Sequence, residues 1–117
     1  MAKEMKKEVS IDVFDQLDLR VGTITKVEDV EKSTKLTKLT VDLGEEQPRI
    51  IICSLREVRD DYKTVEGKQA LFLVNLAPRK IMGITSHGML VTLGYEDGIP
   101  DTMLLSENSL PNGTRAS

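Results

Sequence analysis

The chain has 117 residues, of which 39% are hydrophobic and 30% are charged, and its formal net charge is -3 at pH 7. This length accommodates one domain, and this composition is typical of a globular chain rather than of a disordered or fibrous one. No apolar run approaches the roughly 20 residues of a membrane helix, which excludes membrane insertion, and the charged start of the chain lacks the apolar core of a secretory signal. A single cysteine, Cys53, leaves no intrachain disulfide, so we expect one domain in the cytoplasm.

The chain opens with a charged stretch, 1–9, that has little to bury and is expected to be flexible. Ser10 is then placed to cap a short helix through Leu17, with Val13 and Phe14 on the same face as Leu17.

Alternation of side chains replaces the helical spacing from Leu19 onward and predicts β-strands. Strands are expected at 19–28, 36–43, 49–54, 69–76 and 88–93, with a last edge strand at 103–105. Between the third and fourth strands, the charged stretch 55–66 has apolar residues three and four apart, which predicts a short irregular helix that Gly67 ends. Glycine and proline mark the remaining stretches as turns or loops, at 44–48, 77–86, 94–100 and 111–113.

The expected order is therefore three strands, one helix and two strands, preceded by a short helix and followed by a C-terminal extension. A parallel α/β sheet needs a helix after nearly every strand, so this order excludes it. The simplest closure is an all-β, five-stranded Greek-key barrel of the OB-fold type. Such barrels bind ligands on the face of strands two and three and on the loops that join strands one to two and four to five.

Basic residues fall on those two loops although the chain as a whole is acidic. The stretches 33–40 and 67–95 contain no Asp or Glu. A locally positive groove binds phosphates even when the net charge is negative. Three scattered lysines would by themselves indicate only a solvated surface, whereas adjacent cations in the loop between Pro78 and Gly83 indicate a binding site. The basic residues within or beside these stretches are Lys32, Lys35, Lys38, Lys68, Arg79 and Lys80.

Four segments together resemble the tRNA-binding domain family. They are Asp18-Leu19-Arg20-Val21-Gly22, Val41-Asp42-Leu43-Gly44, Asn75-Leu76-Ala77-Pro78-Arg79-Lys80-Ile81-Met82-Gly83 and Ser86-His87-Gly88-Met89-Leu90. The resemblance covers about residues 13–114 and is most specific in the third and fourth segments. That family includes C-terminal extensions of methionyl-tRNA synthetases, free-standing tRNA-binding proteins and the secretion-linked protein CsaA.

The resemblance implies an OB-fold barrel, a homodimer when the chain is free-standing, and recognition of tRNA shape without catalysis, cofactor or metal. Arg79 and Lys80 would supply phosphate contacts, and Met82 would offer an apolar surface to an unstacked base. The full set of tRNA-facing residues carried over by position is Asn75, Arg79, Lys80, Met82, Ser86 and Met89, with Arg20 and Lys35 as weaker additions.

Other residues give little sign of chemistry. His87 is the one histidine and has no cluster of His, Cys, Asp or Glu at ligand spacing beside it in the sequence. Cys53 lies in a buried-looking strand and is expected in the core. Met89 is expected in the core by strand alternation, although the resemblance places it at the tRNA. Tyr62 and Tyr95 are expected to be half-buried packing residues.

Three functions remain open on sequence grounds. The first is a tRNA-binding protein, free-standing or assisting a methionyl-tRNA synthetase in trans. The second is a CsaA-like export chaperone that binds unfolded polypeptides, favoured by the CsaA-like stretch 104–114. The third is a subunit that docks on a synthetase without contacting RNA. If the protein is a homodimer, we expect residues 1–17 and the C-terminal tail to bury each other's apolar faces.

Overall fold

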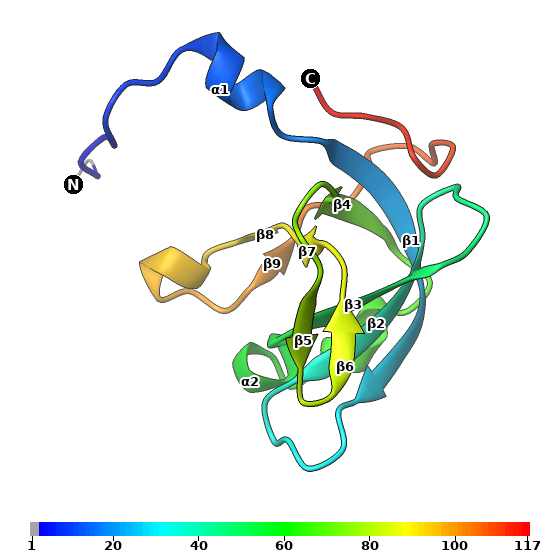
Figure 1. Cartoon of the computed structure of the whole chain (residues 1–117). Coiled ribbons are helices and arrows are strands. Elements are labelled where there is room, and N and C mark those ends of the chain that lie inside the picture. The colour runs from blue at the N-terminus through cyan, green and yellow to red at the C-terminus, as the bar shows by residue number, and fades with distance from the viewer. Residues whose placement is uncertain (1–2) are drawn as a thin grey trace.

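The computed structural model describes residues 3–117 and has a five-stranded antiparallel sheet at its centre (Figure 1). The strands follow the order β3-β2-β1-β4-β7 across the sheet. Their bounds are Leu19–Asp29 for β1, Thr37–Asp42 for β2, Arg49–Cys53 for β3, Gln69–Leu73 for β4 and Met89–Leu90 for β7. The prediction of an all-β, OB-type barrel is confirmed.

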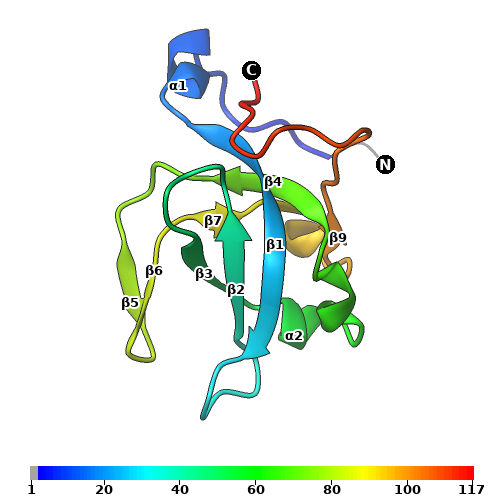
Figure 2. The same ribbon diagram turned by 90° about the vertical axis from the view of Figure 1, so that its right-hand side faces the viewer.

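The sheet curls until its β3 edge meets the segment that precedes β7 (Figure 2). The His87 N–H donates to the Ile50 carbonyl at 2.9 Å, and the Ile52 N–H donates to the Ser86 hydroxyl at 2.9 Å. These two hydrogen bonds nearly close the barrel, and they satisfy backbone groups that an open edge would expose.

Aliphatic side chains fill the barrel, with Phe72 as the largest fully buried one. Alternation on β2 points Thr37, Leu39 and Val41 inward. Cys53 packs against this core, which confirms its predicted place, and burial raises the pKa of its thiol to about 11. The thiol is therefore protonated and unreactive at neutral pH.

The predicted helices are shorter than expected. Helix α1 spans Ile11–Asp15, and Ser10 precedes it without a side-chain capping bond. The predicted helix over 55–66 is wrong as one element, because α2 (Leu55–Val58) and the 3₁₀ turn η1 (Tyr62–Val65) are separate. Arg59 interrupts them with an extended backbone, and its guanidinium binds both carboxylate oxygens of Asp61 at 2.9 and 3.1 Å.

The stretch 77–86, predicted as a loop, is a β-hairpin of β5 (Arg79–Ile81) and β6 (Ile84–Ser86). Its two-residue turn has positive φ at both positions, 52° at Met82 and 79° at Gly83. Such turns match the natural twist of paired strands. Pro78 and Gly83 predict irregular chain, but Gly83 instead supplies a positive-φ turn position between two paired strands.

The predicted strand over 88–93 is divided at Val91. The residues before Val91 form β7, whereas β8 (Thr92–Leu93) turns away to pair with β9 (Thr102–Met103). The 3₁₀ turn η2 (Tyr95–Asp97) lies between β8 and β9. The expected edge strand near 103–105 is therefore present but shifted by one residue at its start.

The C-terminal extension runs antiparallel beside the first half of β1. The Val21 N–H donates to Thr114 at 2.8 Å, and the Gly113 N–H donates to Val21 at 2.7 Å. Gly44 has a φ of 77°, and a Cβ at that position would overlap the Asn112 carbonyl oxygen. Glycine is therefore required where the extension crosses the end of β2.

The N-terminal segment approaches η2. Lys3 and Lys6 lie 3.9 and 3.6 Å from the carboxylates of Asp97 and Glu96, while Met5 and Val9 are largely exposed. The expected flexibility of residues 1–9 stays a prediction, and residues 1 and 2 lie outside the described part of the chain.

Candidate nucleic-acid interface

The β5–β6 hairpin presents two different faces because cross-strand partners point the same way. Arg79 pairs with Ser86 and Ile81 pairs with Ile84, so these side chains share one face of the hairpin. Arg79, which is exposed, and Ser86 line the space between this face and the barrel. Lys80 pairs with Thr85 on the opposite face, and both are exposed. The hairpin therefore holds one cation toward the barrel and one toward solvent.

The hairpin carries two cations that differ from several arginines of the chain in having no acidic partner. Arg20, Arg49 and Arg59 each bind a carboxylate through two nitrogens. Within residues 3–117, Arg79 and Lys80 have no carboxylate within salt-bridge distance. The uncompensated positive charge predicted for the loop between the fourth and fifth strands is thus present on an exposed β-hairpin.

The loop between β1 and β2 reaches the same end of the molecule as the hairpin turn (Figures 1 and 2). Lys32 in this loop has a positive φ of 66° and is exposed. Lys35 lies 3.7 Å from the Glu57 carboxylate, and both side chains are well exposed. An exposed pair of this kind contributes little, so Lys35 is free to exchange Glu57 for a phosphate.

Ser86 does not lie on the surface as a tRNA-facing residue would. Its side chain is buried, with 5% relative exposure, and its hydroxyl accepts the Ile52 N–H. This bond fixes the base of the hairpin to β3. The residue therefore positions the hairpin, and it also lines the space beneath the hairpin.

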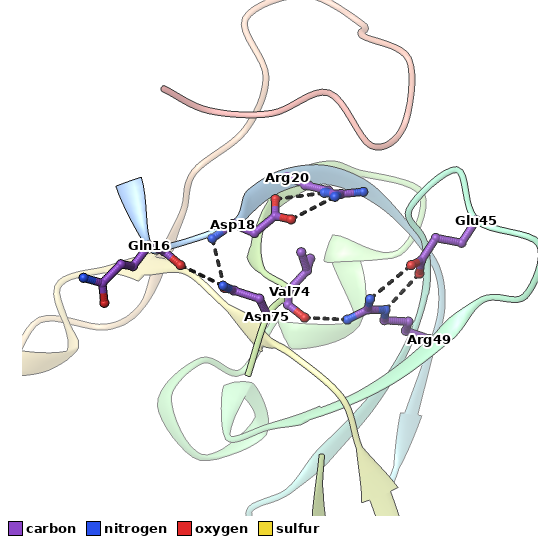
Figure 3. Close-up of polar contacts among 7 residues, drawn as sticks. All are labelled: Gln16, Asp18, Arg20, Glu45, Arg49, Val74 and Asn75. Atoms are coloured by element: carbon purple, nitrogen blue, oxygen red, sulfur yellow. Dashed lines mark hydrogen bonds and ion pairs between the residues drawn. The ribbon is translucent and has the colours of Figure 1, made fainter. Parts of the chain in front are cut away.

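Asn75 is exposed, yet both ends of its amide have partners inside the chain (Figure 3). Its Oδ1 accepts the Asp18 N–H at 2.9 Å, and its Nδ2 donates to the Gln16 carbonyl at 2.8 Å. The amide thus ties the end of β4 to the chain that leads from α1 into β1.

Arg20 lies in the same network and is neutralised (Figure 3). Its Nε and Nη2 donate to the two carboxylate oxygens of Asp18 at 2.9 and 2.8 Å. This hydrogen bonding holds the pKa of Asp18 below its ordinary value. Arg20 is therefore less available to RNA than the two hairpin cations.

A second guanidinium clamp, which sequence reasoning missed, joins the β2–β3 turn to β4 (Figure 3). Arg49 donates to both oxygens of Glu45 at 2.8 and 3.0 Å and to the Val74 carbonyl at 2.7 Å. In the sequence, only the spacing of four residues between Glu45 and Arg49 indicates this ion pair. Arg20 and Arg49 are thus held by carboxylates (Figure 3), whereas no salt bridge within residues 3–117 involves Arg79 or Lys80.

These clamps predict acid sensitivity. Arg20 and Arg49 hold the pKa values of Asp18 and Glu45 below their ordinary values of 3.8 and 4.5. The unfolded chain then takes up protons first on acidification, so this stabilisation is present above those ordinary values and is lost as the pH falls through the lower folded values.

The urea midpoint, measured between pH 6 and pH 2.5, is expected to fall at the acid end of that range. The fall should be shallower in Asp18→Asn, which keeps the backbone bond to Asn75 but no longer titrates. Identical pH profiles for wild type and Asp18→Asn would contradict this role of the carboxylate.

Two methionines lie at the edges of the hairpin region. Met82 at the turn is 55% exposed and Met89 is 46% exposed. The core placement expected for Met89 from alternation is wrong, because Leu90 is the residue of β7 that points inward. Both thioethers are therefore available to a ligand.

The tyrosines follow the packing expectation only in part. Tyr62 packs against the core and donates its hydroxyl to Asp29, whereas Tyr95 is 63% exposed.

Among residues 3–117, no helix is long and apolar enough to cross a membrane.

Residues 19–115 match the family described as "Putative tRNA binding domain". The chain is 40% identical over 114 residues to a methionine–tRNA ligase of Archaeoglobus fulgidus, covering 96% of this chain and 16% of the ligase. It is 46% identical over 107 residues to the methionine–tRNA ligase of Methanococcoides burtonii, covering 92% of this chain and 15% of that enzyme. The chain thus spans less than a fifth of these relatives.

Two solved structures are similar over nearly the whole chain. A protein related to methionyl-tRNA synthetase from Pyrococcus horikoshii superposes with a TM-score of 0.86 at 31% identity, covering 96% of this chain and 100% of that one. The chaperone CsaA from Bacillus anthracis superposes with a TM-score of 0.79 at 27% identity, covering 95% and 100%. With 97 consecutive residues matched, from 19 to 115, the chain belongs to the tRNA-binding domain family, related both to the C-terminal domains of methionyl-tRNA synthetases and to CsaA.

Proposed function

We propose that this protein is a non-catalytic tRNA-binding module that holds the phosphates of tRNA on the β5–β6 hairpin. The observation that carries the proposal is the pair Arg79 and Lys80, exposed and without a carboxylate partner in the described chain. Phosphate contacts position a nucleic acid, and cations free of internal partners make them without first breaking a salt bridge.

The eight residues carried over by the resemblance divide into three roles. Arg79, Lys80, Met82 and Met89 contact RNA directly. Lys35 adds a phosphate contact when it leaves Glu57. Asn75 and Arg20 act through the chain, because their side chains hold the start of β1 in place, and Ser86 fixes the hairpin to β3.

The relationship to methionyl-tRNA synthetases supports a role beside such an enzyme. In this proposal the module raises the local concentration of tRNA for the synthetase, which supplies all of the chemistry. A cytoplasmic location follows from that role.

Retention of total tRNA by the purified protein tests the proposal. We expect binding at about 50 mM salt that weakens steeply toward about 200 mM, because neutralised phosphates release counterions. Absence of salt-sensitive binding at low ionic strength would contradict it.

A second candidate function is favoured by one cavity. A concave space of about 510 Å³ beside β7 and β8 is lined by apolar residues, including Leu55, Leu93 and Tyr95, and by the acids Glu96, Asp97 and Asp101. Apolar walls with an acidic rim suit an unfolded polypeptide carrying lysines, as a CsaA-like chaperone would bind. Apolar peptides flanked by lysines are expected to bind, whereas apolar peptides flanked by glutamates are not. If neither kind of peptide binds, the polypeptide-binding function is excluded.

Dimerisation is proposed from the N-terminal apolar face. Val13, Phe14 and Leu17 are 45%, 38% and 46% exposed in the single chain, and each is large enough to favour burial against a second copy. Light scattering is expected to give twice the mass of 13.0 kDa, whereas a monomeric mass would contradict the dimer.

A further inference from the structure

We propose that the space beneath the β5–β6 hairpin is a pocket for one unpaired nucleobase of the bound tRNA. The pocket has a volume of about 410 Å³ and lies between the hairpin and the outer face of β3. Its walls are formed by Ile52, Leu76, Ala77, Arg79, Ser86 and Met89. This inference rests on the proposed tRNA-binding function and adds a base-reading site to the phosphate contacts.

The walls have the chemistry that holds an unstacked base. Leu76, 40% exposed, and Met89, 46% exposed, offer apolar surface at the mouth, and the Arg79 side chain borders the pocket from β5. Bases removed from a stack are held by flat or polarisable groups, including guanidinium planes and thioethers. No aromatic residue lines this pocket, so the guanidinium and the thioether take the place of the usual aromatic ring.

A polar group at the base of the pocket can read a base edge. The buried Ser86 hydroxyl accepts the Ile52 N–H at 2.9 Å. A hydroxyl also has one proton to donate, and within residues 3–117 that proton has no assigned acceptor. It is therefore free for a carbonyl oxygen or ring nitrogen of a base.

The charge around the pocket favours RNA over a polypeptide as the occupant. Arg79 borders the pocket, Lys80 follows it in β5, and no acidic residue occurs between Gly67 and Tyr95. The neighbouring cavity, on the far side of Met89, has acids on its rim instead. A base that enters the hairpin pocket leaves its own phosphates beside the two cations, whereas a base in the acidic cavity would meet repulsion.

The test compares intact tRNA with transcripts that each lack one base at a single unpaired nucleotide. Binding is measured for wild type, for Leu76→Ala and for Ala77→Phe, which narrows the mouth without removing charge. Ile99→Ala is the matched control, since Ile99 is an exposed apolar residue, 55% exposed, that lines neither cavity.

For wild type and Ile99→Ala, one abasic position is expected to weaken binding by about tenfold or more, the range measured for a stacked base. Leu76→Ala and Ala77→Phe should bind intact tRNA more weakly and lose most of their sensitivity to that position.

If wild type binds intact tRNA and binds every abasic transcript equally well, the pocket is overturned, whereas the phosphate interface is retained. An unchanged abasic loss in both pocket variants would also overturn it. Failure of wild type to bind intact tRNA would instead overturn the proposed function and the pocket with it.

Discussion

Replacing Arg79 and Lys80 together with alanine is expected to weaken tRNA binding roughly ten- to hundredfold at low salt, because each loses a charge-assisted contact to phosphate. The slope of log affinity against log salt should also become shallower, by about one for each phosphate contact removed. Both quantities come from one titration of labelled tRNA at several salt concentrations. The β-hairpin should persist, since neither side chain has a hydrogen-bonding or salt-bridge partner within the described residues.

The matched control removes the same amount of charge elsewhere. Lys63 in η1 and Lys68 just before β4 are both exposed. The start of β4 lies on the side of the barrel away from the β5–β6 hairpin (Figure 2). Lys63→Ala/Lys68→Ala should change affinity only slightly. If it weakened binding as much as the hairpin double variant, net charge rather than the hairpin would be responsible.

Phe72→Ala is expected to lower the free energy of unfolding by about 3–5 kcal/mol, the usual cost of emptying a fully buried aromatic site. Phe72 has 0% relative exposure and pairs with Arg20 of β1 and Leu90 of β7. Removal of the Phe72 ring therefore leaves a cavity beside β4, where β4 pairs with β1 and β7. Urea unfolding followed by circular dichroism measures the change.

Ile99→Ala serves as the control for the stability measurement as well. It truncates an apolar side chain of similar kind that is 55% exposed, and exposed substitutions usually stay within about 0.5 kcal/mol. A loss in Phe72→Ala no larger than that of Ile99→Ala would contradict the central place of Phe72 in the core.

Period-two alternation was sufficient to predict the barrel but not its irregularities. Leu39 and Val41 lie inside, where alternation along β2 puts them. In β1 the inward face passes from Ile24 to Val27, because the pairing register shifts between Ile24 and Lys26. A β-bulge of this kind depends on the partner strand, so alternation within one strand does not reveal it.

The sequence predicts which residues make up the candidate site better than it predicts how the chain arranges them. The absence of acids from 67 to 95 agrees with the lack of salt bridges to Arg79 and Lys80 within the described residues. The sequence also carries a signal for the hairpin, namely two short β-prone runs separated by Met82 and Gly83.

The structural roles of Asn75 and Ser86 could not be predicted from the sequence. Their partners, Gln16, Asp18 and Ile52, lie far away along the chain. A polar side chain that binds a ligand and one that supports the fold look the same until those partners are known.

Binding of tRNA by the hairpin is tested most directly by following backbone amide resonances of the isotope-labelled protein while tRNA is added. We expect the largest perturbations in β5 and β6 and at the turn of Met82, with smaller ones in the β1–β2 loop around Lys35. Perturbations confined to residues 92–97, beside the acidic cavity, or no perturbation at all would contradict tRNA binding by the hairpin.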